Sequence, residues 1–135
     1  MWNFETEPAF RDRLDWMAAF VRDEIEPLDY LFPKDETYNV NNEALMAIMA
    51  PLKARVRDAG LWACHLPAEL GGGGWGQLKL ALMNEILGRS FFAPTVFGTA
   101  APDTGNAEIL AHFGNPAQKE RYLKPLLDGD IVSCF

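Results

Sequence analysis

An all-α fold is predicted by three features of this 135-residue sequence. Apolar residues recur at three- and four-residue steps, the period of an amphipathic helix, in most of its segments. Prolines and capping residues stand where those segments would start or end. Hydrophobic residues make up 49% and charged residues 23%, as in a globular domain that buries a core. We expect a bundle of about five to six helices, without internal repeats or low-complexity segments.

The first helix is predicted from Pro8 to Glu26, with one apolar stripe along it. The stripe consists of Phe10, Leu14, Met17, Val21 and Ile25. Pro8 suits a first helical turn, where a backbone N–H has no partner within the helix. Pro27 has no N–H to continue the hydrogen-bond ladder, so we expect it to end the helix or bend its exit. The polar, turn-rich residues 34–42 then form a connection.

A second apolar stripe predicts a helix that stops at Gly60. The stripe consists of Leu45, Ile48, Met49, Leu52 and Val56. Pro51 interrupts it, so we expect either one kinked helix or a short turn followed by a helix that starts near Pro51. After an apolar link and a glycine run, residues 77–88 are apolar on almost every side. That composition predicts a helix buried at the centre of the bundle.

Three further helical segments are predicted in the last third of the chain. The small residues 96–101 indicate a short helix, and Asp103 is expected to be the N-cap of a helix that ends near Gly114. Residues 115–118 place asparagine at an N-cap, proline at the first helical position and glutamine at the third. The helix that starts there is expected to continue to Asp128.

The end of the chain, residues 131–135, is apolar and β-prone. An apolar end of this kind normally has a neighbouring strand with which to pair. We therefore expect residues 1–130 to form the helical domain. Residues 131–135 are expected to be the first strand of a β-domain that lies beyond the chain.

Charge and apolar run length exclude several classes of function. The formal net charge of −7 argues against a nucleic-acid surface, which needs a basic stripe. No apolar run approaches the roughly 20 residues of a membrane span, and the N-terminus has neither a signal nor a transit pattern. The cysteines, Cys64 and Cys134, leave a disulfide open, but two reduced, buried thiols in a cytoplasmic chain are the favoured interpretation.

Residues 71–76 satisfy the pattern G-x-G-x-x-G, which also occurs in dinucleotide sites. Such a site needs a buried strand before the loop and a second strand after the helix. Residues 61–66 are a poor strand and Pro67 breaks them, so a loop between helices is predicted instead. The histidines and cysteines match no zinc spacing, and the acidic residues are scattered over predicted helix faces. The residues alone therefore show neither catalytic nor metal chemistry.

Six short segments follow one another in an informative order: Ala59–Trp62, Leu66–Gly72, Asn84–Ser90, Ala101–Asn106, Phe113–Lys119 and Leu126–Gly129. Together they resemble the N-terminal domain of the acyl-CoA dehydrogenase family of flavoenzymes. The resemblance covers residues 42–135, while residues 1–41 match only as an opening helix. The stretch Ala-Pro-Asp-Thr-Gly-Asn is most similar to a subgroup whose animal members include large fusions with a kinase-like domain.

This resemblance implies a helical N-terminal domain that is followed, in the family, by a middle β-domain and a C-terminal helical domain. The family's chemistry is the α,β-dehydrogenation of an acyl-CoA thioester. A glutamate base removes the α-proton while the β-hydrogen leaves as hydride to FAD. Electron-transfer flavoprotein usually takes the electrons, and the members are usually dimers or tetramers. The full-length protein is therefore expected to be an FAD-dependent oxidoreductase that acts on an acyl-CoA.

The resemblance assigns roles to few residues of this chain. Phe135 matches an aromatic position beside the flavin and is expected to pack near the isoalloxazine ring. Gly98, Thr99 and Ala100 are expected on a helix that lines the acyl channel, where slim side chains leave room for a chain. A close contact between helices would select the same small residues. The catalytic base is expected beyond the chain, so no glutamate here is assigned as catalytic.

Two alternatives stay open. One is a catalytically inactive helical module that binds a partner, and the other is part of a related acyl-CoA oxidase or flavin monooxygenase. Under the leading hypothesis the domain forms one wall of an apolar slot and excludes water from it. The isolated chain is then expected to lack dehydrogenase activity and to bind flavin weakly at best. It is also expected to self-associate through the bundle face that would meet the β-domain.

Overall fold

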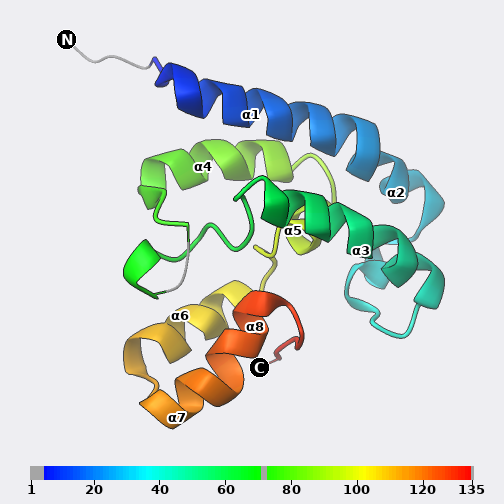
Figure 1. Ribbon diagram of the computed structural model, residues 1–135. Helices are drawn as coiled ribbons and strands as arrows, with labels where there is room; N and C mark the ends of the chain where they lie inside the picture. Colours follow the sequence, from blue (N-terminus) through cyan, green and yellow to red (C-terminus); the bar gives the residue numbers. More distant parts are fainter. Residues whose placement is uncertain (1–4, 71–72, 135) are drawn as a thin grey trace.

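The structure, a computed structural model, describes residues 5–70 and 73–134, and their regular structure is entirely helical (Figure 1). Six helical segments follow one another in these ranges, which confirms the predicted all-α bundle. The predicted strand is not seen: residues 131–134 are irregular, and Phe135 lies outside the described residues. A strand needs a neighbouring backbone as its hydrogen-bond partner, and the described part of the chain offers no other strand.

The first helical segment extends beyond its predicted end. Its parts are α1 (Pro8–Phe20), a π-helical turn (Val21–Ile25) and α2 (Glu26–Leu31). Of the two alternatives expected for Pro27, an end of the helix is wrong, because the helix continues to Leu31. In the π turn the Glu26 N–H donates to the carbonyl of Val21, five residues earlier. Pro27 has no N–H and cannot donate the next hydrogen bond of the helix. The wider π turn before it accommodates this missing bond, so the chain stays helical.

The last helical segment accommodates a proline in the same way. Its parts are α7 (Pro116–Gln118), a second π-helical turn (Lys119–Leu123) and α8 (Lys124–Asp128). Pro125 is the second residue of α8, separated from the π turn by Lys124 alone. The start of the segment is as predicted, because the Asn115 side chain accepts from the Gln118 N–H while the Gln118 side chain accepts from the Asn115 N–H. These reciprocal bonds form a capping box.

Helix α3 (Glu43–Asp58) passes through Pro51 as one helix, so the alternative with a turn before Pro51 is wrong. Its first turn is capped by Asn42, whose side-chain oxygen accepts a hydrogen bond from the Leu45 N–H. The connections on either side of α3 contain two short 3-10 turns, η2 (Lys34–Tyr38) and η3 (Ala68–Leu70).

Helix α4 (Gly76–Leu87) is not buried at the centre of the bundle, contrary to the prediction from its composition. Its buried residues are Met83, Ile86 and Leu87. Leu78, on another face, is 78% exposed. The helix lies beside α1 (Figure 1), and that contact covers only part of its apolar surface. Composition alone does not distinguish a helix that is covered on all sides from one with an apolar face left open.

The segment predicted as a helix at residues 96–101 is mostly irregular, and the short helix lies earlier, as α5 (Ala93–Val96). Gly98 has a φ of +66°, which is outside the helical region. Helix α6 (Asp103–Phe113) ends where it was predicted to end. Asp103 is not its N-cap, however, because the Asp103 carboxylate accepts hydrogen bonds from the end of the chain instead.

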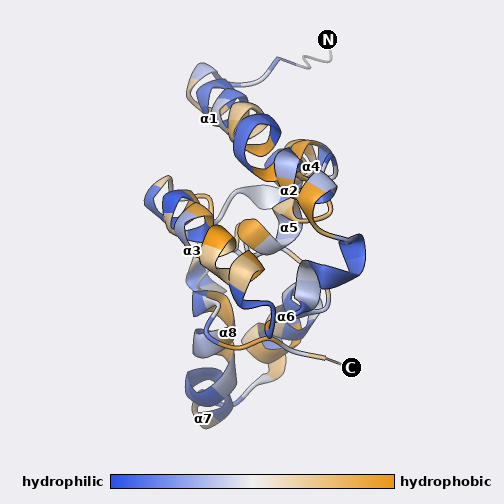
Figure 2. Cartoon of the chain, turned by 90° about the vertical axis from the view of Figure 1, so that its right-hand side faces the viewer, coloured by the Kyte–Doolittle hydropathy of each residue, from blue (hydrophilic) through white to orange (hydrophobic). Residues whose placement is uncertain are grey.

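Two apolar cores hold these helices together. The larger core is formed by α1 to α5 and the link after α3. The smaller core contains Leu66, Ala107, Ala111, Leu123 and Leu126. Figure 2 shows the apolar and polar residues that alternate around each helix to give these cores. Trp62 packs against the larger core and donates a hydrogen bond to α8, so it joins the two.

Candidate functional site

A cavity lies between α3, the loop that follows α5 and the C-terminal end of α8. We call it the Trp62 cavity; its lining includes Met49, Lys53, Trp62, Gly98, Ala100 and Val132. Its volume is about 70 Å³. Pockets that enclose a whole small-molecule ligand are larger, at roughly 300–1,000 Å³. The Trp62 cavity is therefore too small to enclose a whole small-molecule ligand by itself.

The Trp62 cavity has an open end and a buried end. Tyr38, Val40 and Val132 line it and are exposed by 62%, 55% and 64%, so they mark the mouth. Met49 and Ala100 also line it and are exposed by only 1% and 7%. The cavity is thus a shallow apolar slot that leads inward from the surface beside α3.

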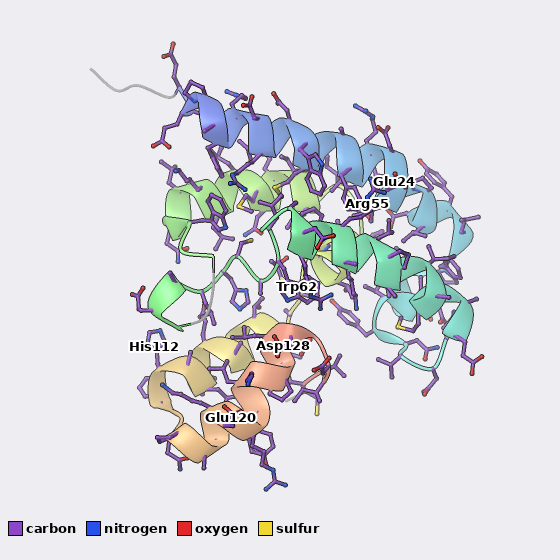
Figure 3. The ribbon with its side chains drawn as sticks, viewed as in Figure 1. Glu24, Arg55, Trp62, His112, Glu120 and Asp128 are labelled. Carbon is purple, nitrogen blue, oxygen red and sulfur yellow. The ribbon has the colours of Figure 1, made fainter. Side chains whose placement is uncertain are left out.

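Trp62 is held in place at this cavity by polar contacts on two sides. Its indole N–H donates a hydrogen bond to the backbone carbonyl of Leu127. The guanidinium carbon of Arg57 lies 3.8 Å from the centre of the indole ring, and the same guanidinium donates to the carbonyl of Asp128. Figure 3 shows Trp62 below α3 and near the end of α8 that carries Asp128. These contacts restrict the indole to one position.

Two glycines make room for the Trp62 indole. A Cβ at Gly98 would lie 2.6 Å from indole Cε2, and a Cβ at Gly129 would lie 2.9 Å from indole Cζ2. Real Cβ contacts are almost never shorter than 3.0 Å. Both glycines also have positive φ angles, +66° and +76°. Glycine is therefore required at both positions by backbone conformation and by the indole.

The residues predicted to line an acyl channel separate into two groups. Gly98 and Ala100 line the Trp62 cavity, but they do so from an irregular loop and not from a helix. Thr99 is not among the described lining residues; its N–H and hydroxyl both point to the carbonyl of Pro94. Phe135, predicted to lie beside a flavin, is outside the described residues. The contact between Gly98 and the indole supports the alternative that close packing selects a small residue.

Trp62, Arg57 and Lys53 all lie at or beside the cavity, but the sequence predicted a site role for none of them. Trp62 was expected only to anchor the core or a loop. For Trp62, the sequence contained one signal of a structural role. Trp62 stands in the segment Ala-Gly-Leu-Trp, and a buried indole needs a hydrogen-bond acceptor. That the acceptor would be the carbonyl of Leu127, 65 residues later, could not be read from spacing.

Lys53 places a positive charge on the wall of the Trp62 cavity. Burial lowers the pKa of its ammonium group below the ordinary 10.5, and the charge of Arg57 lowers it further. The charge of Asp103 acts in the opposite direction. The cavity is therefore apolar along most of its wall, with one cation and one nearby carboxylate.

The end of the chain is fastened to α6 by a small hydrogen-bond cluster. The Asp103 carboxylate accepts from the Ser133 N–H at 2.7 Å and from the Ser133 hydroxyl at 2.6 Å. Asn106 donates to the same hydroxyl at 2.9 Å. Because Ile131 and Val132 line the Trp62 cavity, this cluster holds one side of the cavity mouth in place.

Replacing Asp103 with alanine is expected to release this segment and to lower the free energy of unfolding by about 1–3 kcal/mol, since Ser133 loses a charged acceptor. Asp103→Asn keeps an acceptor oxygen and is the matched control, with a smaller loss. Hydrogen exchange at the Ser133 amide should accelerate strongly in the alanine variant and little in the asparagine variant. Equal exchange in the wild type and the alanine variant would contradict the role of this cluster.

His65 lies in a second hollow, beside the glycine run, which Cys64 and Glu69 also line. Neither of its ring nitrogens has a hydrogen-bond partner among the described residues. Burial lowers the pKa of its imidazole below the ordinary 6.5, and the charge of Glu108 acts against this shift. Burial also raises the pKa of the Cys64 thiol to about 11, so at neutral pH this thiol is protonated and unreactive. Cys134 is exposed, which corrects the expectation of two buried thiols.

His65 is expected to make the protein less stable as the pH falls through 6.5. The unfolded chain takes up a proton near this pH, whereas the folded chain, with its lowered pKa, does so only at lower pH. The free energy of unfolding therefore falls between 6.5 and the folded pKa and is flat below both. Denaturation in urea at several pH values measures this slope. His65→Gln should remove this slope.

Two kinds of feature are missing from the described part of the chain. No group of three or more histidine, cysteine, aspartate or glutamate residues there is arranged to hold a metal ion. No described helix has the length and apolar character needed to cross a membrane. Residues 73–75 of the glycine run are irregular, and residues 71–72 lie outside the described ranges. The described residues before the run form no strand, so the dinucleotide pattern lacks its structural context.

The chain is similar to known proteins over most of its length. The family described as "Acyl-CoA dehydrogenase, N-terminal domain" matches residues 6–130. Mouse acyl-CoA dehydrogenase family member 10 is 33% identical over 133 residues, which cover 95% of this chain and 12% of that protein. Acyl-CoA dehydrogenase family member 11 of Pongo abelii is 47% identical over 88 residues, or 65% of this chain and 11% of that protein.

One solved structure is similar over almost the whole chain. It is that of "a putative acyl-CoA dehydrogenase from Mycobacterium abscessus", with a TM-score of 0.78 and 38% sequence identity. The match covers 95% of this chain and 33% of that chain. The present chain thus spans about a tenth of the two curated relatives and a third of the solved one.

Proposed function

Because this chain belongs to the acyl-CoA dehydrogenase family, we propose that it is the N-terminal helical part of an FAD-dependent acyl-CoA dehydrogenase. Its task in the whole protein is to form one wall of the site in which the acyl chain meets the flavin. The reaction is the α,β-dehydrogenation of an acyl-CoA thioester. The catalytic base belongs to another part of the whole protein, and no glutamate of this chain takes that role.

The Trp62 cavity is the observation that carries this proposal. It is an apolar slot with a mouth and a buried end, and its wall is held by Trp62, Arg57 and Asp103. An apolar wall excludes water, which strengthens the electrostatic interactions of a substrate thioester held against it. The small residue Ala100 lies on this wall, where we propose that it faces the acyl chain, whereas Gly98 is small because the Trp62 indole packs against it.

The Trp62 cavity does not fit a flavin by itself, since a cavity of about 70 Å³ cannot enclose one. FAD therefore requires further parts of the whole protein, and we propose that Phe135 contributes there. Three further elements of the proposal follow from the family: acyl-CoA as substrate, electron-transfer flavoprotein as electron acceptor and a homo-oligomeric assembly. We propose a cytoplasmic location on a separate ground, the free thiols of Cys64 and Cys134.

A domain exchange tests this function. Residues 6–134, which contain the whole lining of the Trp62 cavity, would replace the matching N-terminal segment of an acyl-CoA dehydrogenase whose activity has been measured. The expected result is a chimera that keeps FAD and whose visible flavin absorbance falls when acyl-CoA is added without air. The parent enzyme and a variant that lacks the domain are the positive and negative controls.

Other results of the exchange would overturn the proposal in distinguishable ways. A folded chimera that holds FAD but is never reduced by acyl-CoA would favour a helical module without a catalytic role. A chimera reduced by acyl-CoA whose electrons pass rapidly to oxygen, giving hydrogen peroxide where the parent gives none, would favour the oxidase alternative.

A further inference from the structure

We propose that Lys53 and Thr95 bind a carboxylate carried by the acyl chain, so that the enzyme prefers a carboxyacyl-CoA to an unsubstituted acyl-CoA of the same length. This inference rests on the proposed function and adds two specificity-determining residues to it. Both residues line the Trp62 cavity. Each brings to it a hydrogen-bond donor that no described residue satisfies.

The ammonium group of Lys53 is a half-buried cation without a direct partner. None of the described residues forms a salt bridge or a hydrogen bond with it. A lysine can bury its stem and keep its ammonium in water, but here burial acts on the ammonium itself, because it lowers the pKa of that group. A charge partly removed from water is costly until an opposite charge pairs with it. An anion in the cavity would supply this partner.

Lys53 lines the cavity from α3, and Asp103 lines it from the start of α6. The two charges interact, since the Asp103 carboxylate favours the charged form of Lys53. Asp103 is nevertheless not the missing partner. Its carboxylate accepts two hydrogen bonds from Ser133, and no salt bridge joins it to Lys53 in the described structure. The cation on this wall therefore remains available to a ligand.

Thr95 lines the same cavity from α5. Its hydroxyl oxygen is buried and has no hydrogen-bond partner among the described residues. Buried hydroxyl groups normally have a partner, because leaving one unpaired costs free energy. A carboxylate has oxygens that only accept hydrogen bonds, so it can accept one from this hydroxyl and one from Lys53. Two helices thus bring unpaired donors to one small space.

The size and the charge of the cavity favour a carboxylate over a phosphate. A volume of about 70 Å³ has room for roughly five water-sized groups, which suits a carboxylate and the methylene groups next to it. A phosphate monoester carries about two negative charges at neutral pH. The wall offers one cation, Lys53, and the charge of Asp103 would repel a second negative charge. The apolar side chains of Met49 and Ala100 suit the methylene groups.

The test compares three acyl-CoAs of equal chain length in the chimera described above: the carboxyacyl-CoA, its uncharged amide and the unsubstituted acyl-CoA. The wild type should have the highest kcat/KM for the carboxyacyl-CoA. Lys53→Met keeps the length of the side chain and removes its charge. It should lower the ratio of kcat/KM for the carboxyacyl-CoA to that for the unsubstituted one about ten- to hundredfold, the usual effect of losing a charged hydrogen bond.

Three further variants make this test specific. Thr95→Val removes an uncharged donor and should lower the same ratio about three- to tenfold. Lys53→Arg restores a cation and should recover most of the preference. Lys79→Met is the matched control, because the Lys79 side chain is also half-buried, at 33% exposed, but does not line the cavity. It should leave the ratio unchanged.

Calorimetric titration with the same three compounds gives the corresponding ratios of affinity without turnover, and circular dichroism shows whether each variant is folded. If Lys53→Met does not fold, the comparison of carboxylate with amide in the wild type still decides. An active chimera that treats the two alike, or a folded Lys53→Met variant with an unchanged ratio, would overturn this inference alone. A wild-type chimera that neither binds nor oxidises any acyl-CoA would overturn the proposed function, and the inference with it.

Discussion

Replacing Trp62 with alanine is expected to lower the free energy of unfolding by about 3–5 kcal/mol, the usual cost of removing a large aromatic side chain from a packed site. The loss has two causes. The indole packs against the larger core, and its N–H bonds the carbonyl of Leu127 in the helix that closes the smaller core. Without the indole, the two cores lose their main connection.

Urea denaturation of the purified chain, followed by circular dichroism, measures this loss. Tyr30→Ala is the control, because Tyr30 is 90% exposed and its removal should cost less than about 0.5 kcal/mol. The Trp62 variant should also show separate transitions for the two cores, since their coupling is weakened. A loss no larger than that of the Tyr30 variant would show that Trp62 does not join the cores.

Replacing Gly98 with alanine is expected to lower the free energy of unfolding by about 2–5 kcal/mol. Part of this cost comes from its φ of +66°, which an alanine adopts with strain. The remainder comes from overlap, since the new Cβ would lie 2.6 Å from indole Cε2. The indole is held by its hydrogen bond to the Leu127 carbonyl and by the Arg57 guanidinium over its ring. Moving it away would therefore cost free energy.

The chain offers a matched control for this second prediction. Gly60 has nearly the same φ, +68°, but a Cβ there would meet nothing within 4 Å. Gly60→Ala should therefore cost only the backbone strain, about 1–2 kcal/mol. Combining Gly98→Ala with Trp62→Phe should cost less than the sum of the two single changes, because the smaller ring relieves the overlap. Strictly additive losses would mean that the glycine and the indole do not interact.

Helix ends were predictable where the signal is local. The capping box at Asn115 and Gln118 is formed as predicted, because both partners lie within four residues of each other. The prediction that Asp103 is an N-cap was wrong because the partner of its carboxylate is not local. Its carboxylate had a local option, the N-cap, but the backbone and hydroxyl of Ser133 are brought to it by the fold. The residues next to Asp103 in the sequence do not indicate that its partner is Ser133, 30 residues later.

The prolines illustrate a second limit of sequence reasoning. Pro27 predicted a helix end because proline breaks the backbone ladder. The structure keeps the helix and widens the preceding turn, at Pro27 and again at Pro125. A helix can continue past a proline through a π turn when the residues on both sides of the proline are held by packing. Leu28 and Leu126, directly after the two prolines, are both buried, so each helix gains core contacts by continuing.

The sequence by itself determined the helical class, the positions of most helices and the family, because periodicity, capping residues and short ordered segments are local properties of the chain. Only the tertiary structure decided which apolar faces are covered, as the exposed Leu78 of α4 shows, and why Gly98 is small. Gly98, Trp62 and Leu127 are far apart in the sequence and meet through close packing. Packing and hydrogen bonding between distant residues, not composition, therefore shape the wall of the candidate site.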